Sequence, residues 1–348
     1  MNLEFKQSSR IKLDHCPCVI ESLDDSNAYV VGTYELDENG AAQEDSSHDN
    51  NRKGSLGLIR NAKLITEQNC HDGGVFDLKV FERIVITAHA NGNLCSYKQK
   101  DDAFELISSF HTGSNMLTSI DYVSFDDNVL IAASDANGFA FTLLSNKELH
   151  LNLIETHSNI KLSTTGDPVW RIKLLHVFSD ECVLISGSDD CNLRINSVKG
   201  VKIGEVPMCI RKDAGAGVTS LEVIRSETPN EYMLLCGSYD ENLRIYKMKI
   251  ALGQVDLSLQ KKILIPDAGI WKTRSFEGLR LVAGMYAGAI ITNSADEEIV
   301  SVLSKFDDGD SNHTNQQDLI YDTVVDKSFT RILVASFYKK VIYVFENA

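Results

Sequence analysis

The chain has 348 residues, which is long enough for one large closed domain and too long for a small domain held together by disulfides. Acidic residues outnumber basic ones by 49 to 34, giving a formal net charge of −15. This charge argues against direct nucleic-acid binding, which needs clustered Lys and Arg side chains. It favours instead a cationic ligand or a basic partner surface.

The N-terminal sequence has no apolar run of signal-peptide length, and no stretch of 18 apolar residues occurs anywhere in the chain. We therefore expect a cytoplasmic protein without a membrane span, and we expect it to be monomeric. Eight cysteines are scattered singly, apart from Cys16 and Cys18. Without a secretory signal, these cysteines are expected to be reduced and mostly buried in strands.

A short strand pattern recurs along the chain after 42, 52, 49, 52 and 50 residues. Its copies begin at Val75, Leu117, Val169, Val218, Ile270 and Ile320. Each copy is followed by a second apolar strand, a tight turn and a third strand, as in residues 183–196 and 233–246. A repeat of this length and content is typical of a WD40-type β-propeller. A degenerate copy at residues 16–65 brings the predicted number of blades to seven.

The last predicted blade is one strand short, because the chain ends at Ala348 after three strands. We expect Leu3–Leu13 to pair with the strand containing Val341–Phe345, which removes the open edges of an incomplete ring. Residues 1–348 would then form a single all-β propeller domain. The polar, acidic segments 37–53 and 306–317 are expected to be flexible loops.

Sequence signatures of metal and nucleophile sites are missing. The chain has no G-x-S-x-G elbow, no H-E-x-x-H and no paired C-x-x-C, so we expect neither a metal nor an organic cofactor. The pair Cys16 and Cys18 is interpreted as a strand entry rather than a redox pair. Asp190 and Asp240 are interpreted as structural turn residues.

In a propeller, the start of each innermost strand and the residue before the next turn approach one face of the ring. At these positions, blades four to seven carry aromatic and acidic residues, which we predict to bind substrate: Trp170, Asp189, Tyr239, Trp271, Tyr286, Tyr321 and Tyr338. Blades two and three offer Phe76, Thr118, Ala90 and Ala136 there. Aromatic rings beside carboxylates suit a quaternary ammonium ligand through cation–π attraction. The competing interpretation is that these rings pack between blades.

Five stretches together resemble the WD-repeat diphthine methylesterase family of diphthamide biosynthesis. They are GTYEL (32–36), SGSDD (186–190), GSYDENLR (237–244), GIWK (269–272) and ASFY (335–338). The SGSDD stretch is generic to propellers, whereas the ordered combination of the others is more specific. The chain departs from the pattern in having no Trp-Asp dipeptide and in carrying Lys339 after the SFY triplet.

The resemblance implies hydrolysis of the methyl ester of methylated diphthine on translation elongation factor 2, giving diphthine and methanol. The trimethylammonium group of diphthine agrees with the predicted aromatic and acidic site. Two other functions stay open: a non-catalytic WD40 scaffold for a protein complex, and a reader of methylated lysine.

Ester hydrolysis needs a general base that activates water and donors that stabilise the oxyanion. The sequence does not identify these groups. The candidates are His157 in a loop ahead of blade four, His176 within that blade, His313 in the acidic loop before blade seven, and Asp322.

Overall fold

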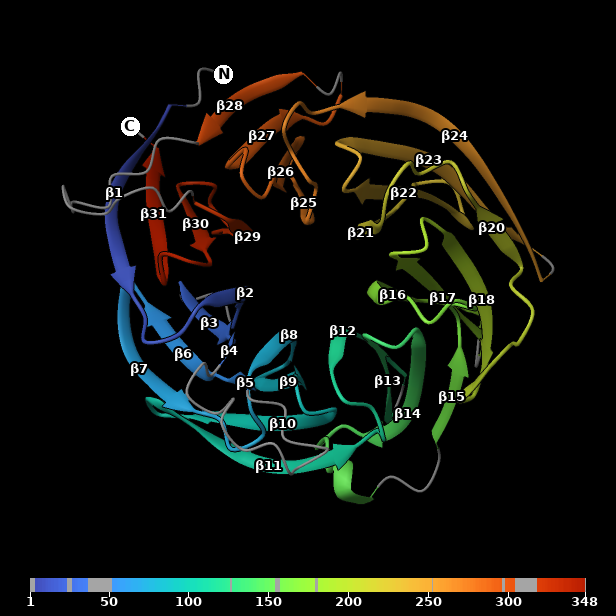
Figure 1. Cartoon of the computed structure of the whole chain (residues 1–348), viewed down its shortest axis with the longest axis horizontal. Coiled ribbons are helices and arrows are strands. Elements are labelled where there is room, and N and C mark those ends of the chain that lie inside the picture. Colours follow the sequence, from blue (N-terminus) through green and yellow to red (C-terminus); the bar gives the residue numbers. More distant parts are fainter. Residues whose placement is uncertain are drawn as a thin grey trace. The chain divides into compact units, whose positions relative to one another are not determined.

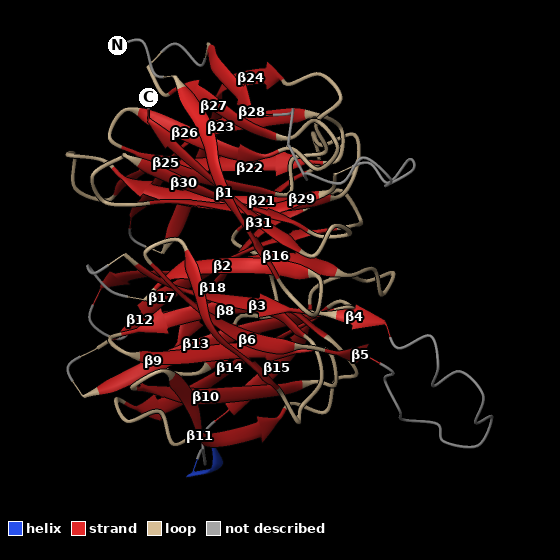
Figure 2. Ribbon diagram, turned by 90° about the vertical axis from the view of Figure 1, so that its left-hand side faces the viewer, coloured by secondary structure: helices blue, strands red, loops and turns tan. Residues whose placement is uncertain are grey.

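The computed structural model describes residues 4–23, 27–36, 52–125, 127–153, 157–178, 181–251, 253–295, 298–303 and 318–347. Their regular structure is almost entirely β-strand, joined by loops and one short 3-10 helix, η2 (Leu151–Leu153), as Figure 2 shows. No helix in these ranges is long and apolar enough to cross a bilayer. Seven antiparallel sheets confirm the predicted all-β, seven-bladed propeller (Figure 1).

The chain divides into two compact units. The first comprises Met1–Asn91, Tyr97–Glu105 and Pro266–Ala348, and the second comprises Gly92–Ser96 and Leu106–Ile265. The expectation of one domain over residues 1–348 stays a prediction.

Blades one, six and seven belong to the first unit. Blade one contains β2 (Pro17–Ser22), β3 (Ala28–Thr33), β6 (Ser55–Arg60) and β7 (Lys63–Asn69). Blade six contains β25 (Lys272–Phe276), β26 (Leu279–Ala283), β27 (Ala289–Asn293) and β28 (Ile299–Leu303). Blade seven contains β29 (Ile320–Val325), β30 (Arg331–Ser336), β31 (Val341–Asn347) and β1 (Phe5–Lys12). Blade two contains β8 (Val75–Phe81) and β9 (Ile84–His89), both of the first unit, followed by β10 (Asn93–Lys100) and β11 (Ala103–His111).

Blades three, four and five belong to the second unit. Blade three contains β12 (Leu117–Ser124), β13 (Asn128–Asp135), β14 (Phe139–Asn146) and β15 (His157–Lys161). Blade four contains β16 (Val169–Phe178), β17 (Glu181–Ser188), β18 (Leu193–Lys199), β19 (Lys202–Ile203) and β20 (Cys209–Arg211). Blade five contains β21 (Val218–Arg225), β22 (Glu231–Ser238), β23 (Asn242–Ala251) and β24 (Gln254–Leu264).

The N-terminal strand completes blade seven, as predicted. Strand β1 pairs antiparallel with β31, in a register that runs from Phe5 opposite Asn347 to Lys12 opposite Val341. Figure 1 shows the two ends of the colour scale, β1 and β31, side by side. Phe5 and Ile11 are buried, and the residues between them alternate outward. The pairing therefore covers the edge of β31 and seals two apolar side chains.

Innermost strands share an irregularity near their first residue. In six blades the pairing register shifts there, so that the register skips one residue. These residues are Cys18, Phe76, Thr118, Trp170, Thr219 and Tyr321. In blade six the equivalent Trp271 precedes β25 and bonds through its N–H to Ala283 O at 2.9 Å. A β-bulge re-aims a side chain, which explains why these positions stand apart from the ordinary alternation.

One predicted loop was too long. Arg52–Lys53 form strand β5, which pairs with β4 (Glu35–Leu36). The chain is therefore already extended two residues before β6 of blade one begins. Residues 37–51 and the predicted loop at 306–317 lie outside the described residues.

Candidate functional site

Five aromatic rings of the first unit form a closed circuit of contacts. Tyr34 and Phe76 have centroids 5.7 Å apart, and Phe76 and Trp271 6.4 Å apart. Trp271 meets Tyr321 at 4.9 Å, and Tyr321 meets Phe337 at 4.6 Å. Phe337 returns to Tyr34 at 5.8 Å. This aromatic circuit draws on blades one, two, six and seven.

Exposure differs strongly around the aromatic circuit. Trp271 is only 4% exposed, and Phe76 and Phe337 are each 8% exposed, so these rings mainly pack. Tyr34 and Tyr321 are half-buried. Beside the circuit, Tyr338 contacts Phe337 at 5.2 Å and is 46% exposed, and Tyr286 is 49% exposed. A ligand would therefore meet tyrosine rings before it met the tryptophan.

The aromatic site predicted from the sequence comprised blades four to seven and included neither Tyr34 nor Phe337. Tyr34 lies in the stretch GTYEL and Phe337 in ASFY, so the motif residues themselves carried the missing signal. Phe76, which lies on a blade outside the predicted site, contacts both Tyr34 and Trp271. The aromatic circuit therefore includes residues of blades one and two.

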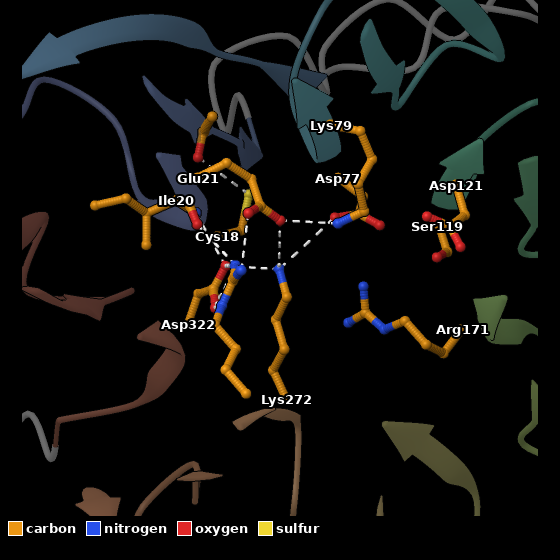
Figure 3. Close-up of polar contacts among 12 residues, drawn as sticks. Cys18, Ile20, Glu21, Asp77, Lys79, Ser119, Asp121, Arg171, Lys272 and Asp322 are labelled. Carbon is orange, nitrogen blue, oxygen red and sulfur yellow. Dashed lines mark hydrogen bonds and ion pairs between the residues drawn. The ribbon is translucent and has the colours of Figure 1, made fainter. Parts of the chain in front are cut away.

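A buried network of charged side chains lies one to three residues further along the innermost strands of the same blades (Figure 3). Asp322 Oδ2 accepts hydrogen bonds from Lys272 Nζ at 2.6 Å and from Arg274 Nη2 at 3.0 Å. It also accepts one from the backbone N–H of Ile20 at 3.0 Å. Glu21 receives Arg274 Nη1 at 2.8 Å and Lys79 Nζ at 2.8 Å.

The contacts of Asp322 favour a structural role over the catalytic one predicted for it. The residue is 0% exposed, and its oxygens are engaged by two cations and two backbone N–H groups. A carboxylate held in this way has no open path to a substrate water, whereas its removal would leave buried cations uncompensated.

Burial sets the pKa values in this region. Desolvation lowers the pKa of Lys272 to about 8, an effect that the attraction of Asp322 only partly offsets. Burial would raise the pKa of Glu21, but Arg274, Lys79 and Lys272 hold it well below its usual range. Burial also raises the pKa of the Cys18 thiol well above its usual value and that of Cys16 to about 11. Both thiols are therefore protonated near neutral pH, which argues against a thiolate nucleophile.

A histidine–carboxylate pair borders the aromatic circuit and escaped sequence reasoning. His15 Nδ1 lies 3.1 Å from Glu35 Oε2, and His15 Nε2 lies 3.3 Å from Asn69 Oδ1. Lys340 Nζ donates to both oxygens of Glu35 at 2.8 and 2.9 Å. Burial alone would raise the pKa of Glu35, but the hydrogen bonds from Lys340 and His15 lower it. Only Glu35, within GTYEL, carried a sequence signal.

In the second unit, three predicted binding residues lie together. Trp170 Nε1 donates to Asp189 Oδ1 at 3.0 Å. A Cβ atom added to Gly217 would fall 2.3 Å from Asp189 Oδ1 and 3.1 Å from Tyr239 Cδ2, so this glycine lets both side chains approach. Burial, and then the nearby Asp189 carboxylate, raises the pKa of Tyr239. Asp189 is exposed and both rings are half-buried.

The structure thus brings Trp170, Asp189 and Tyr239 together in one unit, and Trp271, Tyr321 and Tyr338 in the other. Binding of one cation by Trp271 with Tyr239 stays a prediction.

The two Asp residues expected to be structural lie in tight turns and pair with arginines of the following strand. Asp190 Oδ1 accepts from Arg194 Nη1 at 3.0 Å, and Asp240 Oδ1 accepts from Arg244 Nη1 at 3.0 Å. Arg244 is 1% exposed, so its guanidinium depends on that carboxylate. The stretch GSYDENLR therefore owes part of its composition to a turn.

The predicted histidines take separate places. His157 is the first residue of β15 in blade three, not part of a loop ahead of blade four, because its segment pairs with β14. Its ring packs edge-on against Phe110 with centroids 5.5 Å apart. His176 lies on β16 in blade four as predicted, and its ring meets Phe125 at 4.9 Å. His313 lies outside the described residues.

No family model matches the chain. The chain is similar to a curated protein of Dictyostelium discoideum described as "Diphthine methyltransferase homolog". The two are 25% identical over 353 residues, which covers 88% of this chain and 87% of that protein. Among the described residues, no group of three or more His, Cys, Asp or Glu side chains is arranged to hold a metal ion.

Proposed function

We propose that this protein acts in diphthamide biosynthesis by hydrolysing the methyl ester of methylated diphthine on translation elongation factor 2. The name of the similar Dictyostelium protein, which refers to diphthine, supports the pathway. The resemblance of the stretches GTYEL, GIWK and ASFY to the methylesterase family supports the reaction.

The observation that carries the proposal is the aromatic circuit, because these same three stretches contribute Tyr34, Trp271 and Phe337 to it. Neighbouring centroids are 4.6–6.4 Å apart. Cation–π attraction reaches about 6 Å from a ring centroid, so a cation held against the accessible tyrosine rings would lie within range of them. The half-buried faces of Tyr34 and Tyr321 and the exposed ring of Tyr338 would receive the trimethylammonium group first.

The chemistry that fits these residues is attack by an activated water rather than by a thiolate, because burial keeps Cys16 and Cys18 protonated. Methyl ester hydrolysis requires a base for the water and donors for the oxyanion, and no redox chemistry. We therefore propose a reaction without metal or organic cofactor. Activity should survive a chelator, and activity lost to the chelator and restored by zinc would contradict this part.

A second candidate is a non-catalytic scaffold, and the burial of Trp271, Phe76 and Phe337 favours it. On this view the circuit packs blades together and binds no cation. A reader of methylated lysine would use the same rings without hydrolysis.

The deciding experiment incubates purified full-length protein with elongation factor 2 that carries the methyl-esterified intermediate, followed by intact mass measurement. The proposal predicts a loss of mass equal to one methylene group and release of one methanol for each substrate. A folded sample that binds the substrate but leaves its mass unchanged would favour a reader. A folded sample that neither binds nor hydrolyses it would favour the scaffold.

A further inference from the structure

We infer that His15 is the general base of the proposed ester hydrolysis and that Glu35 is the residue that positions its ring. This inference rests on the proposed function and adds to it the identity of the group that activates water. Glu35 belongs to the stretch GTYEL, whereas His15 lies in none of the recognised motifs, and their contact joins residues 20 positions apart.

Three chain segments bring this pair to the border of the aromatic circuit. His15 directly precedes Cys16, which packs in one apolar cluster with Phe337 and Tyr34. Glu35 directly follows Tyr34, whose N–H bonds to Cys16 O at 2.9 Å. Lys340 ends the turn after Phe337, and its N–H bonds to Phe337 O at 3.0 Å. The same three backbone segments therefore position both the His15–Glu35 pair and the rings of Tyr34 and Phe337.

The contacts orient the imidazole as a base requires. With Nδ1–H donating to Glu35, Nε2 carries the lone pair. Nε2 faces the Asn69 side chain, whose Oδ1 lies 3.3 Å away; a half-turn of that amide presents its N–H group to the lone pair, and at this exposed position a water molecule can take its place. The His15 side chain is 14% exposed, which leaves it open to solvent on one side. Lys340 keeps Glu35 ionised, and this charge stabilises the imidazolium when it forms.

The proposed step balances without a co-reactant. Water oxygen attacks the ester carbonyl carbon while His15 Nε2 takes the water proton. The tetrahedral intermediate then collapses and expels methoxide, which receives the proton from the imidazolium and leaves as methanol. The products are the carboxylic acid, which ionises, and methanol, and His15 returns to its neutral form.

Charged groups surround the imidazole ring of His15. Glu35 faces Nδ1, and Lys340 lies behind Glu35. Glu67 on β7 bonds to the N–H of Asp14 at 2.9 Å, next to His15 in the chain, and Cys16 follows. Glu35→Gln should lower kcat with little change in KM, because the imidazolium that forms during the reaction then lacks a neighbouring carboxylate.

The test measures kcat and KM of full-length His15→Gln on methyl-esterified elongation factor 2. We expect kcat to fall about 100-fold or more, with KM within about threefold of wild type. His111→Gln is the matched control, because His111 bonds to Asn93 at 2.8 Å in an exposed position, without a carboxylate. Its kcat should match that of wild type. In His15→Ala, added imidazole should restore part of the activity, which it could not do for a misfolded protein.

The outcomes separate the two claims. An active wild type with an equally active His15→Gln overturns the role of His15 and leaves the proposed function standing. An inactive His15→Ala that imidazole does not rescue, together with an unchanged kcat in Glu35→Gln, also overturns it. A folded wild type without esterase activity overturns the proposed function, and the role of His15 with it.

Discussion

Trp271 and Lys272 are adjacent in the chain but have opposite surroundings. Trp271 lies between the rings of Phe76 and Tyr321, and Lys272 Nζ points into the buried ion network. An aromatic residue followed by a charged one recurs at Tyr321 and Asp322, so one register supplies both the rings and the ions. Replacement of either type should therefore affect stability, and activity has to be separated from folding.

We expect Trp271→Ala to lower the free energy of unfolding by about 3–5 kcal/mol, because the ring is 4% exposed. Tyr338→Ala, at a 46% exposed ring, should change it by less than about 0.5 kcal/mol. If the exposed ring meets the substrate cation, Tyr338→Ala lowers kcat/KM about two- to thirtyfold. Denaturant unfolding and esterase assays on the same preparations check both, with Val206→Ala, at an 80% exposed side chain, as the control. Unchanged activity per folded Tyr338→Ala molecule would remove this ring from the site.

Asp322→Asn should be strongly destabilising, because it leaves Lys272 and Arg274 buried without their shared carboxylate. Breaking one side of a buried ion pair costs about 3–5 kcal/mol. Glu181→Gln, which breaks an exposed pair with Lys199, should leave the melting temperature nearly unchanged. Calorimetry of the three proteins compares them. If Asp322→Asn melts like wild type, the buried network does not stabilise blades one, two, six and seven, which contribute its residues.

Local pattern accounts for which residues could be recognised from the sequence. The rings of Trp271 and Tyr321 were found because each stands at the same place in a repeated strand. His15 stands in no repeat, and its partner Glu35 is also held by Lys340, 305 residues away. Contacts between residues so far apart in the sequence depend on how whole blades are placed in register. The amino-acid sequence alone does not reveal that register.

Among the strands, β1 is one whose partner could be predicted from the sequence. Its pairing with β31 follows from a count of strands and from the cost of an open edge. Blade one was harder to delimit, because residues 37–51 separate β3 from β6 and obscure their pairing. The repeat period therefore predicted blades two to seven more sharply than blade one.

Ile11→Ala should destabilise the protein by about 2–5 kcal/mol, because Ile11 is 5% exposed and packs with residues of blades one and seven. Arg10→Ala, on the outward side of the same strand, should have little effect. Urea unfolding gives both values. If the two variants unfold alike, β1 does not seal the last blade.

Glu35 of β4 pairs with Lys340 in the turn between β30 and β31, and we expect this contact to make the stability of the protein depend on pH in the acid range. Glu35 has a pKa below its ordinary value of 4.5, so its contribution to stability is present above that pH. It is lost as the pH falls through the lowered pKa. Glu35→Gln should therefore melt below wild type at pH 7, and the gap should close below about pH 4.5. Melting curves across this range measure the gap, and a gap that stays constant down to pH 3 would assign the effect to packing.

For the molecule as a whole, the excess of acidic side chains bears on how it meets its substrate. A formal charge of −15 creates a field that attracts cationic surfaces from solution and weakens as salt shortens its range. If the protein substrate presents a basic surface around its trimethylammonium group, association is steered. We expect kcat/KM to fall about three- to tenfold between 50 and 300 mM salt. The rate at saturating substrate should stay constant, because chemistry follows binding. Measuring both parameters across the salt series separates association from chemistry. A flat kcat/KM, or one that rises with salt, would show that the net charge of the chain does not guide this encounter.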